Sequence, residues 1–272
     1  MADAKIRLFV DHPLAAGQPV PLTQDQAHYL FGVMRLGPGA AVLLFNGRDG
    51  EWRAVVAEAG KRGGMLVCET QTAPLCPPPD LWLLFAPIKK ARTDFIVEKA
   101  TEMGVARIMP VQTQHTNADR IRQDRLQAHA MEAAEQCGAT AVPEVADLAP
   151  LDRVLATWPA ERRLMWADEA LAGRPFAQTG DIAGAGGSSA LTGDIAGGQR
   201  GDPSGLTSGF GEPRGPWAVL IGPEGGFSAP EQARLRAMPQ IVPVRLGPRI
   251  LRADTAAVAA LTLWQMTLGD WI

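Results

Sequence analysis

The clearest chemical signal in the chain is a glycine-rich segment that follows an apolar run. Residues 220–228 have the sequence LIGPEGGFS, and Ser228 and Glu231 have the spacing of a capping box, which predicts that a helix begins at Ser228. Glycines between a strand and a helix let backbone N–H and C=O groups approach a ligand closely, as a nucleotide-like cofactor requires. The segment matches neither the P-loop pattern nor G-x-G-x-x-G. It therefore indicates either a cofactor site of another type or only a tight loop.

A second segment with the same order of elements follows closer to the C-terminus. Residues 246–256 have the sequence LGPRILRADTA, which predicts the end of a strand, an irregular turn and the start of a helix. Five arginines and no acidic residue lie between Gln232 and Ala253. Such a cluster is either a solvated basic face or a surface that binds a polyanion.

The elements that position these segments alternate between strands and helices. Apolar runs predict strands at 81–86, 107–111, 164–167 and 217–221, and helices are expected at 93–103, 122–137 and 255–268. This alternation predicts an α/β domain with a mostly parallel sheet covered by helices. The last helix has no charged residue. It must therefore be covered on nearly all sides, either within the domain or at a subunit interface.

The N-terminal part of the chain predicts a smaller domain of another kind. Short strands at 6–10, 40–45, 52–57 and 65–69, with one helix at 23–36, favour a small β-barrel. The proline-rich stretch 74–79 is a stiff linker between this domain, 1–73, and the α/β domain, 80–272. An insertion at about 178–215 is rich in Gly, Ser, Ala and Pro and contains the hexapeptide TGDIAG twice. We expect this insertion to be disordered.

Composition limits the class of protein. Hydrophobic residues make up 46% and charged residues 20% of the chain, as in globular proteins with a core. No apolar run reaches the roughly 20 residues of a membrane span, and no secretory signal is evident, so we expect a cytoplasmic protein without a membrane partner. Three cysteines and four histidines have no metal-ligand spacing, which argues against a bound metal. The net charge of −3 does not by itself indicate a nucleic-acid partner.

The two C-terminal segments resemble the motifs of SPOUT methyltransferases, and specifically those of the RsmE family of 16S ribosomal RNA uracil-N3 methyltransferases. Residues 99–105 (KATEMGV), 134–138 (AEQCG) and 142–144 (VPE) are similar to that family's catalytic domain. Residues 28–30 (HYL) and 33–35 (VMR) are similar to its PUA-like RNA-binding domain. The resemblance covers almost the whole chain outside the insertion. Two positions depart from it, since residues 139–141 lack an arginine that is common there and Asp254 stands where glutamate is common.

This resemblance implies a fold, a reaction and partners. The fold would be a C-terminal SPOUT α/β domain with a trefoil knot, preceded by a small PUA-like β-barrel. The reaction would be methylation of uracil N3 in the 16S rRNA of the small ribosomal subunit, with S-adenosylmethionine as cofactor and no metal. The protein would be a homodimer, and the uncharged last helix suits its interface.

The resemblance also implies roles for individual residues. Arg252 would stabilise negative charge on the uracil as N3 loses its proton, and Asp254 is a candidate base or a helix cap. The residues expected to bind the cofactor come from the two glycine-containing segments: Leu220, Gly222, Pro223, Glu224, Gly225, Gly226, Leu246, Gly247, Ile250, Leu251 and Thr255. The residues expected to contact RNA are Arg7, His28, Arg35, Lys89 and Arg92. For Lys89 and Arg92 a solvated turn is an equal explanation.

Two other functions stay open at this point. One is a SPOUT enzyme with a different target, such as a ribose 2′-oxygen in transfer RNA. The PUA-like N-terminus and the LGPRILRADTA segment disfavour that function. The other is a non-catalytic RNA-binding factor for ribosome assembly. The intact glycine segment at 222–226 argues against it, because a protein that had lost its activity would be expected to lose these glycines.

Overall fold

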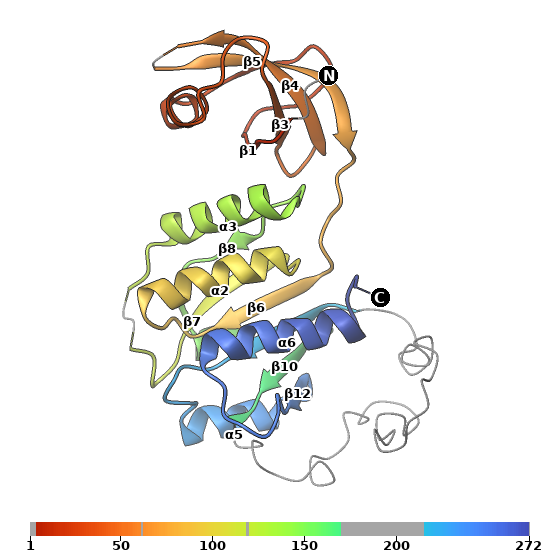
Figure 1. Ribbon diagram of the computed structural model, residues 1–272. Helices are drawn as coiled ribbons and strands as arrows, with labels where there is room; N and C mark the ends of the chain where they lie inside the picture. Colours follow the sequence, from red (N-terminus) through yellow and green to blue (C-terminus); the bar gives the residue numbers. More distant parts are fainter. Residues whose placement is uncertain (1–3, 61, 118–119, 170–214, 272) are drawn as a thin grey trace, which may run out of the picture. The chain divides into compact units, whose positions relative to one another are not determined.

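The protein is described from a computed structural model, which covers residues 4–60, 62–117, 120–169 and 215–271 (Figure 1). The insertion predicted at 178–215 lies outside these residues, apart from Gly215. The chain divides into two compact units, Met1–Pro78 with Gln127–Pro143, and Pro79–Leu126 with Glu144–Ile272. The break at residue 78 falls in the predicted linker. The assignment of Gln127–Pro143 to the first unit was not predicted, and it places most of one helix in that unit.

The first unit is built on a curled five-stranded sheet in the order β1-β3-β4-β5-β2. Its strands are β1 (Arg7–Phe9), β2 (Pro19–Pro21), β3 (Ala41–Phe45), β4 (Glu51–Ala59) and β5 (Gly64–Ala73). Strand β1 pairs with β3 in parallel, and the other neighbours are antiparallel. The predicted barrel therefore takes the form of a curled sheet with β1 and β2 at its edges. Strand β2 was not predicted because two of its three residues are prolines.

The helix predicted at 23–36 is divided into α1 (Gln24–Ala27) and a π-helical segment, η1 (His28–Val33). Thr23 and Gln26 form a capping box that begins α1. The α-helical periodicity of 23–36 predicts that Ala27, Leu30 and Met34 share one buried face. Ala27 and Leu30 are buried, but Met34 is 42% exposed. A π-helical turn holds more residues than an α-helical turn. The side chains after it are therefore rotated away from the face that the α-helical pattern predicts.

The second unit has a parallel sheet in the order β12-β10-β11-β6-β7-β8, which confirms the predicted α/β class. The strands are β6 (Leu81–Phe85), β7 (Arg107–Gln112), β8 (Glu144–Val145), β10 (Arg163–Ala167), β11 (Trp217–Ile221) and β12 (Ile241–Val244), with the short β9 (Ala149–Pro150) beside β7. The helices are α2 (Lys90–Glu102), α3 (Gln123–Cys137), α4 (Leu151–Ala156), α5 (Ala229–Ala237) and α6 (Ala253–Thr267). Helix α3 runs from the second unit into the first.

The helices pack on the sheet through the alternating side chains of its strands. Leu220 of β11 lies in a buried cluster with Leu155 of α4 and Leu235 of α5. The next residues along β11 point to the opposite face because strand side chains alternate. Helix α6 packs on β11 and also lies against α2. All five residues of β11 are buried, as expected for a central parallel strand.

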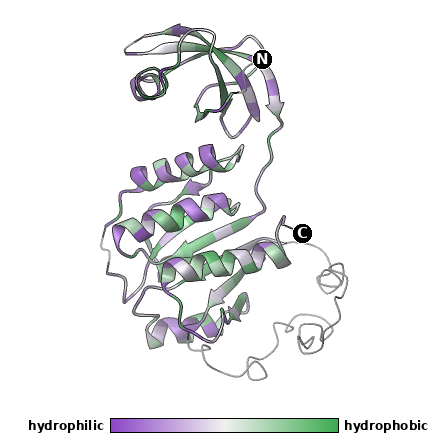
Figure 2. Ribbon diagram, in the orientation of Figure 1, coloured by the Kyte–Doolittle hydropathy of each residue, from purple (hydrophilic) through white to green (hydrophobic). Residues whose placement is uncertain are grey.

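Helix α6 is apolar over most of its length (Figure 2). Leu261 and Trp264 are fully buried, and Gln265 donates a hydrogen bond from Nε2 to the carbonyl of Met103. Leu263 and Met266, in contrast, are 36% and 61% exposed. The uncharged helix thus covers the core with one face and presents apolar side chains on another. Within the described residues, none of the helices combines the length and apolar character needed to cross a membrane.

Candidate cofactor-binding pocket

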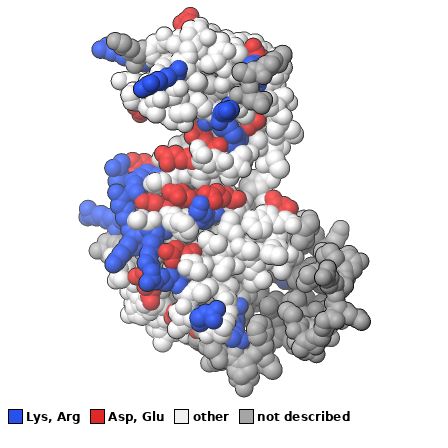
Figure 3. Space-filling model, in the orientation of Figure 1, with Lys and Arg blue, Asp and Glu red and all other residues white. Residues whose placement is uncertain are grey.

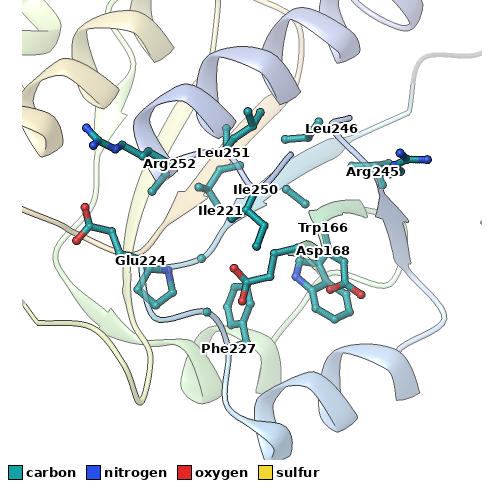
Figure 4. A pocket seen from close by; sticks show the side chains of 18 of the residues that line it. Trp166, Asp168, Ile221, Glu224, Phe227, Arg245, Leu246, Ile250, Leu251 and Arg252 are labelled. Atoms are coloured by element: carbon teal, nitrogen blue, oxygen red, sulfur yellow. The ribbon is translucent and has the colours of Figure 1, made fainter. Parts of the chain in front are cut away.

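A pocket lies beyond the carboxyl ends of three neighbouring strands, β10, β11 and β12 (Figure 4). In parallel α/β sheets this is the edge where ligands bind, because the connecting loops open there. The pocket is lined by residues 166–169, 221–224, 226–227, 244–247 and 249–253, together with Gln232 and Ala256. Three loops that are distant in sequence are therefore brought to one site by adjacent strands.

The loop between β11 and α5 is a tight turn that depends on glycine. The N–H of Gly226 donates to the carbonyl of Pro223 at 2.9 Å. Gly226 has a φ of 68°, and a Cβ built on it would overlap the carboxylate of Glu169. A Cβ on Gly222 would lie 2.7 Å from the ring of Phe227. The predicted capping box at Ser228 is confirmed and begins α5 directly after this turn.

The loop between β12 and α6 forms the opposite wall. Arg245 Nε donates to the carbonyl of Gly247 at 3.0 Å, and Gly247 has a φ of 125°. Leu246 and Leu251 line the pocket from this loop. Arg252 is the N-cap residue of α6, but its exposed side chain makes no capping hydrogen bond. The loop therefore supplies apolar side chains together with an available guanidinium.

Aromatic side chains form another part of the wall. Trp166 of β10 meets Phe227 edge to face, with 5.9 Å between the ring centroids. The indole Nε1 of Trp166 is buried and has no hydrogen-bond partner among the described residues. An unpaired buried donor is uncommon in a folded protein and calls for a ligand or a water molecule. Flat apolar surfaces next to an unused donor suit a heteroaromatic group such as a nucleobase.

Both signs of charge occur in the lining. Asp168 pairs with Arg236 at 3.3 Å, and Glu224 pairs with Arg92 at 3.3 Å. Burial, and then the charge of Asp168, raise the pKa of Glu169. Cationic side chains come from Arg245, Arg249 and Arg252. Glu224 and Arg252 lie on one side of the pocket and Arg245 on the other (Figure 4). No group of three or more potential metal ligands occurs in the part of the chain that the structure describes.

Most of the residues predicted to bind a cofactor meet in this pocket. Those that line it are Gly222, Pro223, Glu224, Gly226, Leu246, Gly247, Ile250 and Leu251. Three others do not. Leu220 lies in the core because its side chain points to α4 and α5, Gly225 packs against His115, and Thr255 is exposed on the first turn of α6.

The surroundings of Asp254 bear on its predicted role as base or helix cap, and its Oδ1 accepts a hydrogen bond from the N–H of Thr255 at 2.9 Å. Asp254 does not line the pocket, and its carboxylate lies 3.6 Å from Arg92 Nε. The N-cap of α6 is Arg252, so Asp254 stands in the first turn of the helix rather than at its cap. Arg92 contacts Glu224 and Asp254 together. It therefore joins the start of α2 to both pocket loops.

The residues predicted to contact RNA lie in different environments. Arg7 is held inside the first unit: its guanidinium donates to Glu51 at 2.7 Å and to the carbonyls of Ala134 and Ala139. It also stacks on the ring of Phe45. Its side chain is only 12% exposed. Arg7 is therefore a structural residue, because its donors are already used within the unit.

The other four predicted RNA contacts keep part of their surface in solvent. His28 and Arg35 are exposed in the first unit, and Arg35 has a φ of 55°, which is unusual for a residue with a side chain. Lys89 is the exposed N-cap residue of α2. Arg92 is 31% exposed beside its two carboxylate partners. These positions are open to a polyanion, although Arg92 also has a structural role.

Sequence reasoning missed the contribution of β10. Trp166, Asp168 and Glu169 line the pocket because β10 lies between β11 and β12 in the sheet. An apolar strand followed directly by Asp-Glu was a usable signal, since polar residues at the carboxyl end of a parallel strand face the ligand edge. His115, after β7, was also missed. Its Nδ1 lies 3.0 Å from the carbonyl oxygen of Gly225 and 3.1 Å from that of Gly226.

Lysine and arginine side chains gather over the starts of α2 and α3 (Figure 3). We call this the basic surface, and it consists of Lys89, Lys90, Arg92, Arg120, Arg122 and Arg125. Arg122 pairs with Asp124, and Arg125 pairs with Asp94. Lys89, Lys90 and Arg120 have no ion pair among the described residues. Arg92 connects this surface to the rim of the pocket through Glu224.

A parallel sheet with a glycine-lined pocket beyond its carboxyl ends, beside a basic surface, is typical of α/β proteins that bind a nucleotide-like cofactor and a polyanion. The chain belongs to the RNA methyltransferase family, whose domain model matches residues 76–192 and 199–265. A model of the RNA methyltransferase PUA domain matches residues 22–64. The two domain types predicted from the sequence are thereby confirmed.

Individual relatives are similar to the chain over nearly its whole length. A Rickettsia conorii protein named ribosomal RNA small subunit methyltransferase E is 24% identical over 256 residues, which cover 94% of this chain and 93% of the relative. A Mycobacterium bovis protein of the same name is 29% identical over 271 residues, which cover 97% of this chain and 92% of the relative. A similar solved structure is the crystal structure of ribosomal RNA small subunit methyltransferase E from Neisseria gonorrhoeae bound to S-adenosyl methionine. It has a TM-score of 0.76 and 24% sequence identity, and the match covers 98% of this chain and 99% of that chain. These similarities confirm the resemblance and the SPOUT fold class.

Proposed function

We propose that this chain transfers the methyl group of S-adenosylmethionine to N3 of a uracil in 16S ribosomal RNA. The relatives named ribosomal RNA small subunit methyltransferase E support this proposal because they match the chain from end to end. The Neisseria gonorrhoeae structure with its bound S-adenosyl methionine supports the choice of cofactor. RNA in the small ribosomal subunit as substrate would also place the protein in the cytoplasm.

The observation on which the proposal chiefly depends is the chemistry of the pocket lining. Ile221, Phe227 and Leu251 offer apolar surface, and Trp166 adds an indole whose buried Nε1 has no hydrogen-bond partner among the described residues. Carboxylates and guanidiniums in the same lining suit the ammonium and carboxylate of an amino acid. The glycine turn at 222–226 gives room that a Cβ would fill. The residues present therefore fit S-adenosylmethionine.

When bound, S-adenosylmethionine supplies a methyl group on a positively charged sulfur, which is already an electrophile and needs no metal. In the transfer, uracil N3 gives its proton to solvent water and forms a bond to the methyl carbon, while the S–CH₃ electron pair returns to sulfur and S-adenosylhomocysteine leaves. Negative charge develops on the uracil as the proton leaves. Arg252 would stabilise this charge, because it belongs to the pocket lining, its exposed guanidinium lies at the rim (Figure 4), and it forms no ion pair in the described residues.

The basic surface would bind the phosphates of the RNA. Lys89, Lys90 and Arg120 are exposed and have no ion pair with the described residues, so their charges are available to phosphate oxygens. Arg92 connects this surface to the pocket rim. In the first unit, His28 and Arg35 would contribute further contacts. Phosphate contacts position the RNA, and the pocket would then select the base.

We also propose a homodimer in which α6 forms part of the interface. Leu263 and Met266 are apolar, exposed and one turn apart on this helix. Ala256, Leu261 and Trp264 are buried within the chain, Val258 and Leu268 are half-buried, and Leu263 and Met266 are the large apolar side chains of this helix that are exposed. Covering two such side chains with a second copy removes apolar surface from water.

Mass spectrometry of 16S rRNA from a deletion strain tests the proposed function. The strain should lack one N3-methyluridine, and a plasmid with the wild-type gene should restore it. A plasmid with the Arg252→Ala variant should not. Loss of a 2′-O-methylated nucleotide instead would support the other SPOUT activity. An unchanged set of modified nucleosides would favour a non-catalytic assembly factor.

A further inference from the structure

Among the carboxylates of the pocket lining, Glu169 is the one without a partner in the described part of the chain. Asp168 pairs with Arg236, and Glu224 pairs with Arg92. Glu169, directly after Asp168, makes neither a hydrogen bond nor an ion pair with the described residues. A charge that the protein leaves unpaired inside a ligand pocket is available to a ligand of opposite charge.

The position of Glu169 is set by the glycine loop. A Cβ on Gly226 would overlap its Oε1, so the carboxylate rests against the turn that follows β11. Any residue other than glycine at 226 would displace it and would also strain a φ of 68°. Glu169 is exposed, so a ligand can reach the carboxylate.

The surroundings of Glu169 favour a cationic ligand group. Burial and the neighbouring Asp168 both raise its pKa, which means that the negative form is less well solvated here than in water. A bound cation would reverse that disadvantage. The arginines of the lining, Arg245, Arg249 and Arg252, come from the loop between β12 and α6. The pocket thus offers a carboxylate on its β10 side and guanidiniums from the β12 loop.

We propose that Glu169 binds a cationic group of S-adenosylmethionine, either the sulfonium or the ammonium of its amino acid part. The inference rests on the proposed function and adds to it the residue that recognises the positive charge of the methyl donor. A carboxylate near the sulfonium favours the charged donor over the neutral thioether product. A carboxylate near the ammonium holds donor and product alike.

Calorimetry with three ligands tests this assignment. S-adenosylmethionine has both cationic groups, S-adenosylhomocysteine has only the ammonium, and methylthioadenosine has neither. The variants are Glu169→Gln, which keeps the shape and removes the charge, and Glu161→Gln as a control at an exposed position outside the pocket. We expect Glu169→Gln to bind S-adenosylmethionine roughly tenfold more weakly, since a charge-assisted contact becomes a neutral one. Affinity for methylthioadenosine should be unchanged.

The remaining ligand tells which cation is bound. An equal loss for S-adenosylhomocysteine assigns the ammonium, and no loss assigns the sulfonium. Unchanged affinity for S-adenosylmethionine in Glu169→Gln would overturn the inference, as would an equal loss for methylthioadenosine. If the wild-type protein binds none of the three ligands, the proposed function itself fails. The two failures are therefore distinguishable.

Discussion

Arg252 is placed so that its positive charge can act on a substrate. The residue belongs to the pocket lining, its exposed side chain extends outward at the rim (Figure 4), and it has no ion pair among the described residues. The nearest acidic side chains in sequence and in the neighbouring loop, Asp254 and Glu224, are both neutralised by Arg92. The guanidinium of Arg252 is therefore not used to fix the loop. This arrangement leaves the charge of Arg252 available to a substrate at the pocket rim, where charge would develop on the uracil.

We predict that Arg252→Ala abolishes methyl transfer while S-adenosylmethionine still binds. Loss of one preorganised donor commonly lowers the rate by roughly 10²- to 10³-fold. Arg252→Lys should restore little activity, because lysine lacks the planar fork of donors. Single-turnover kinetics and calorimetry measure the two effects separately. A variant that melts early and loses the cofactor would instead show a structural role.

The raised pKa of Glu169 also predicts how the stability of the fold depends on pH. Because its pKa is raised in the folded protein, ionising Glu169 disfavours the folded state. This destabilisation is present above the raised pKa and disappears when the pH falls below the ordinary glutamate value of about 4.3. Glu169→Gln should therefore melt at a higher temperature than the wild type at neutral pH. Melting curves at neutral and acidic pH would contradict the account if the difference grew on acidification.

At the scale of elements, the loop after β11 is held from outside by the segment after β7. The carbonyls of Gly225 and Gly226 can only accept hydrogen bonds, so Nδ1 of His115 must donate to them. A second contact joins the same segments, since the N–H of Gln114 donates to Glu231 at the start of α5. Together these contacts fix the outer side of the cofactor loop.

We predict that His115→Ala weakens S-adenosylmethionine binding by about fivefold, the effect of losing a hydrogen bond of about 1 kcal/mol. His115→Asn should bind nearly as well as the wild type, because its amide nitrogen can take the place of Nδ1. Calorimetry of the two variants makes the comparison. Equal losses in both variants would rule out the hydrogen bond as the cause.

Much of the α/β unit could be predicted from the sequence because its strands are apolar and its caps are local. The strands at 81–85 and 217–221 and the capping box at Ser228 depend only on nearby residues. Two local signals failed. The prolines of β2 hid a strand, and the π-helical turn at 28–33 moved Met34 out of the predicted face. Both involve a backbone departure that hydropathy does not encode.

The site could be predicted only where one segment supplies it. Gly222, Gly226 and Leu251 follow from the two glycine-containing segments. Glu169 depends on strand order, because β10 reaches the pocket only by lying between β11 and β12. Strand order arises from packing of the whole sheet, and no local pattern specifies it. The trefoil knot that the resemblance implies is a property of the same global kind, and it stays a prediction.

For the whole molecule, the basic surface predicts a measurable dependence of RNA binding on salt. Replacing Lys89, Lys90 and Arg120 by alanine should weaken binding and flatten the plot of log affinity against log salt. Each lost phosphate contact lowers the slope by about 0.7 to 0.9. Arg153→Ala, on the exposed side of α4, is the control and should leave the slope unchanged. A triple variant with the wild-type slope would place the RNA elsewhere.

The proposed dimer predicts a second property of the whole molecule. Met266→Asp or Leu263→Asp would bury an unpaired charge in the interface, at a cost of a few kcal/mol. Light scattering should then show monomers, whereas Ala233→Asp on the exposed side of α5 should leave the dimer intact. A wild-type protein that is monomeric at micromolar concentration would refute this interface.

The most direct test of the central claim follows the methyl group itself. Purified protein in EDTA would be given S-adenosylmethionine with a deuterated methyl group and small ribosomal subunits from the deletion strain. The 16S rRNA would then be digested and its nucleosides measured by mass spectrometry. The account predicts deuterated N3-methyluridine from the wild type and none from Arg252→Ala. Label on a ribose 2′-oxygen, or no label in the RNA at all, would contradict it.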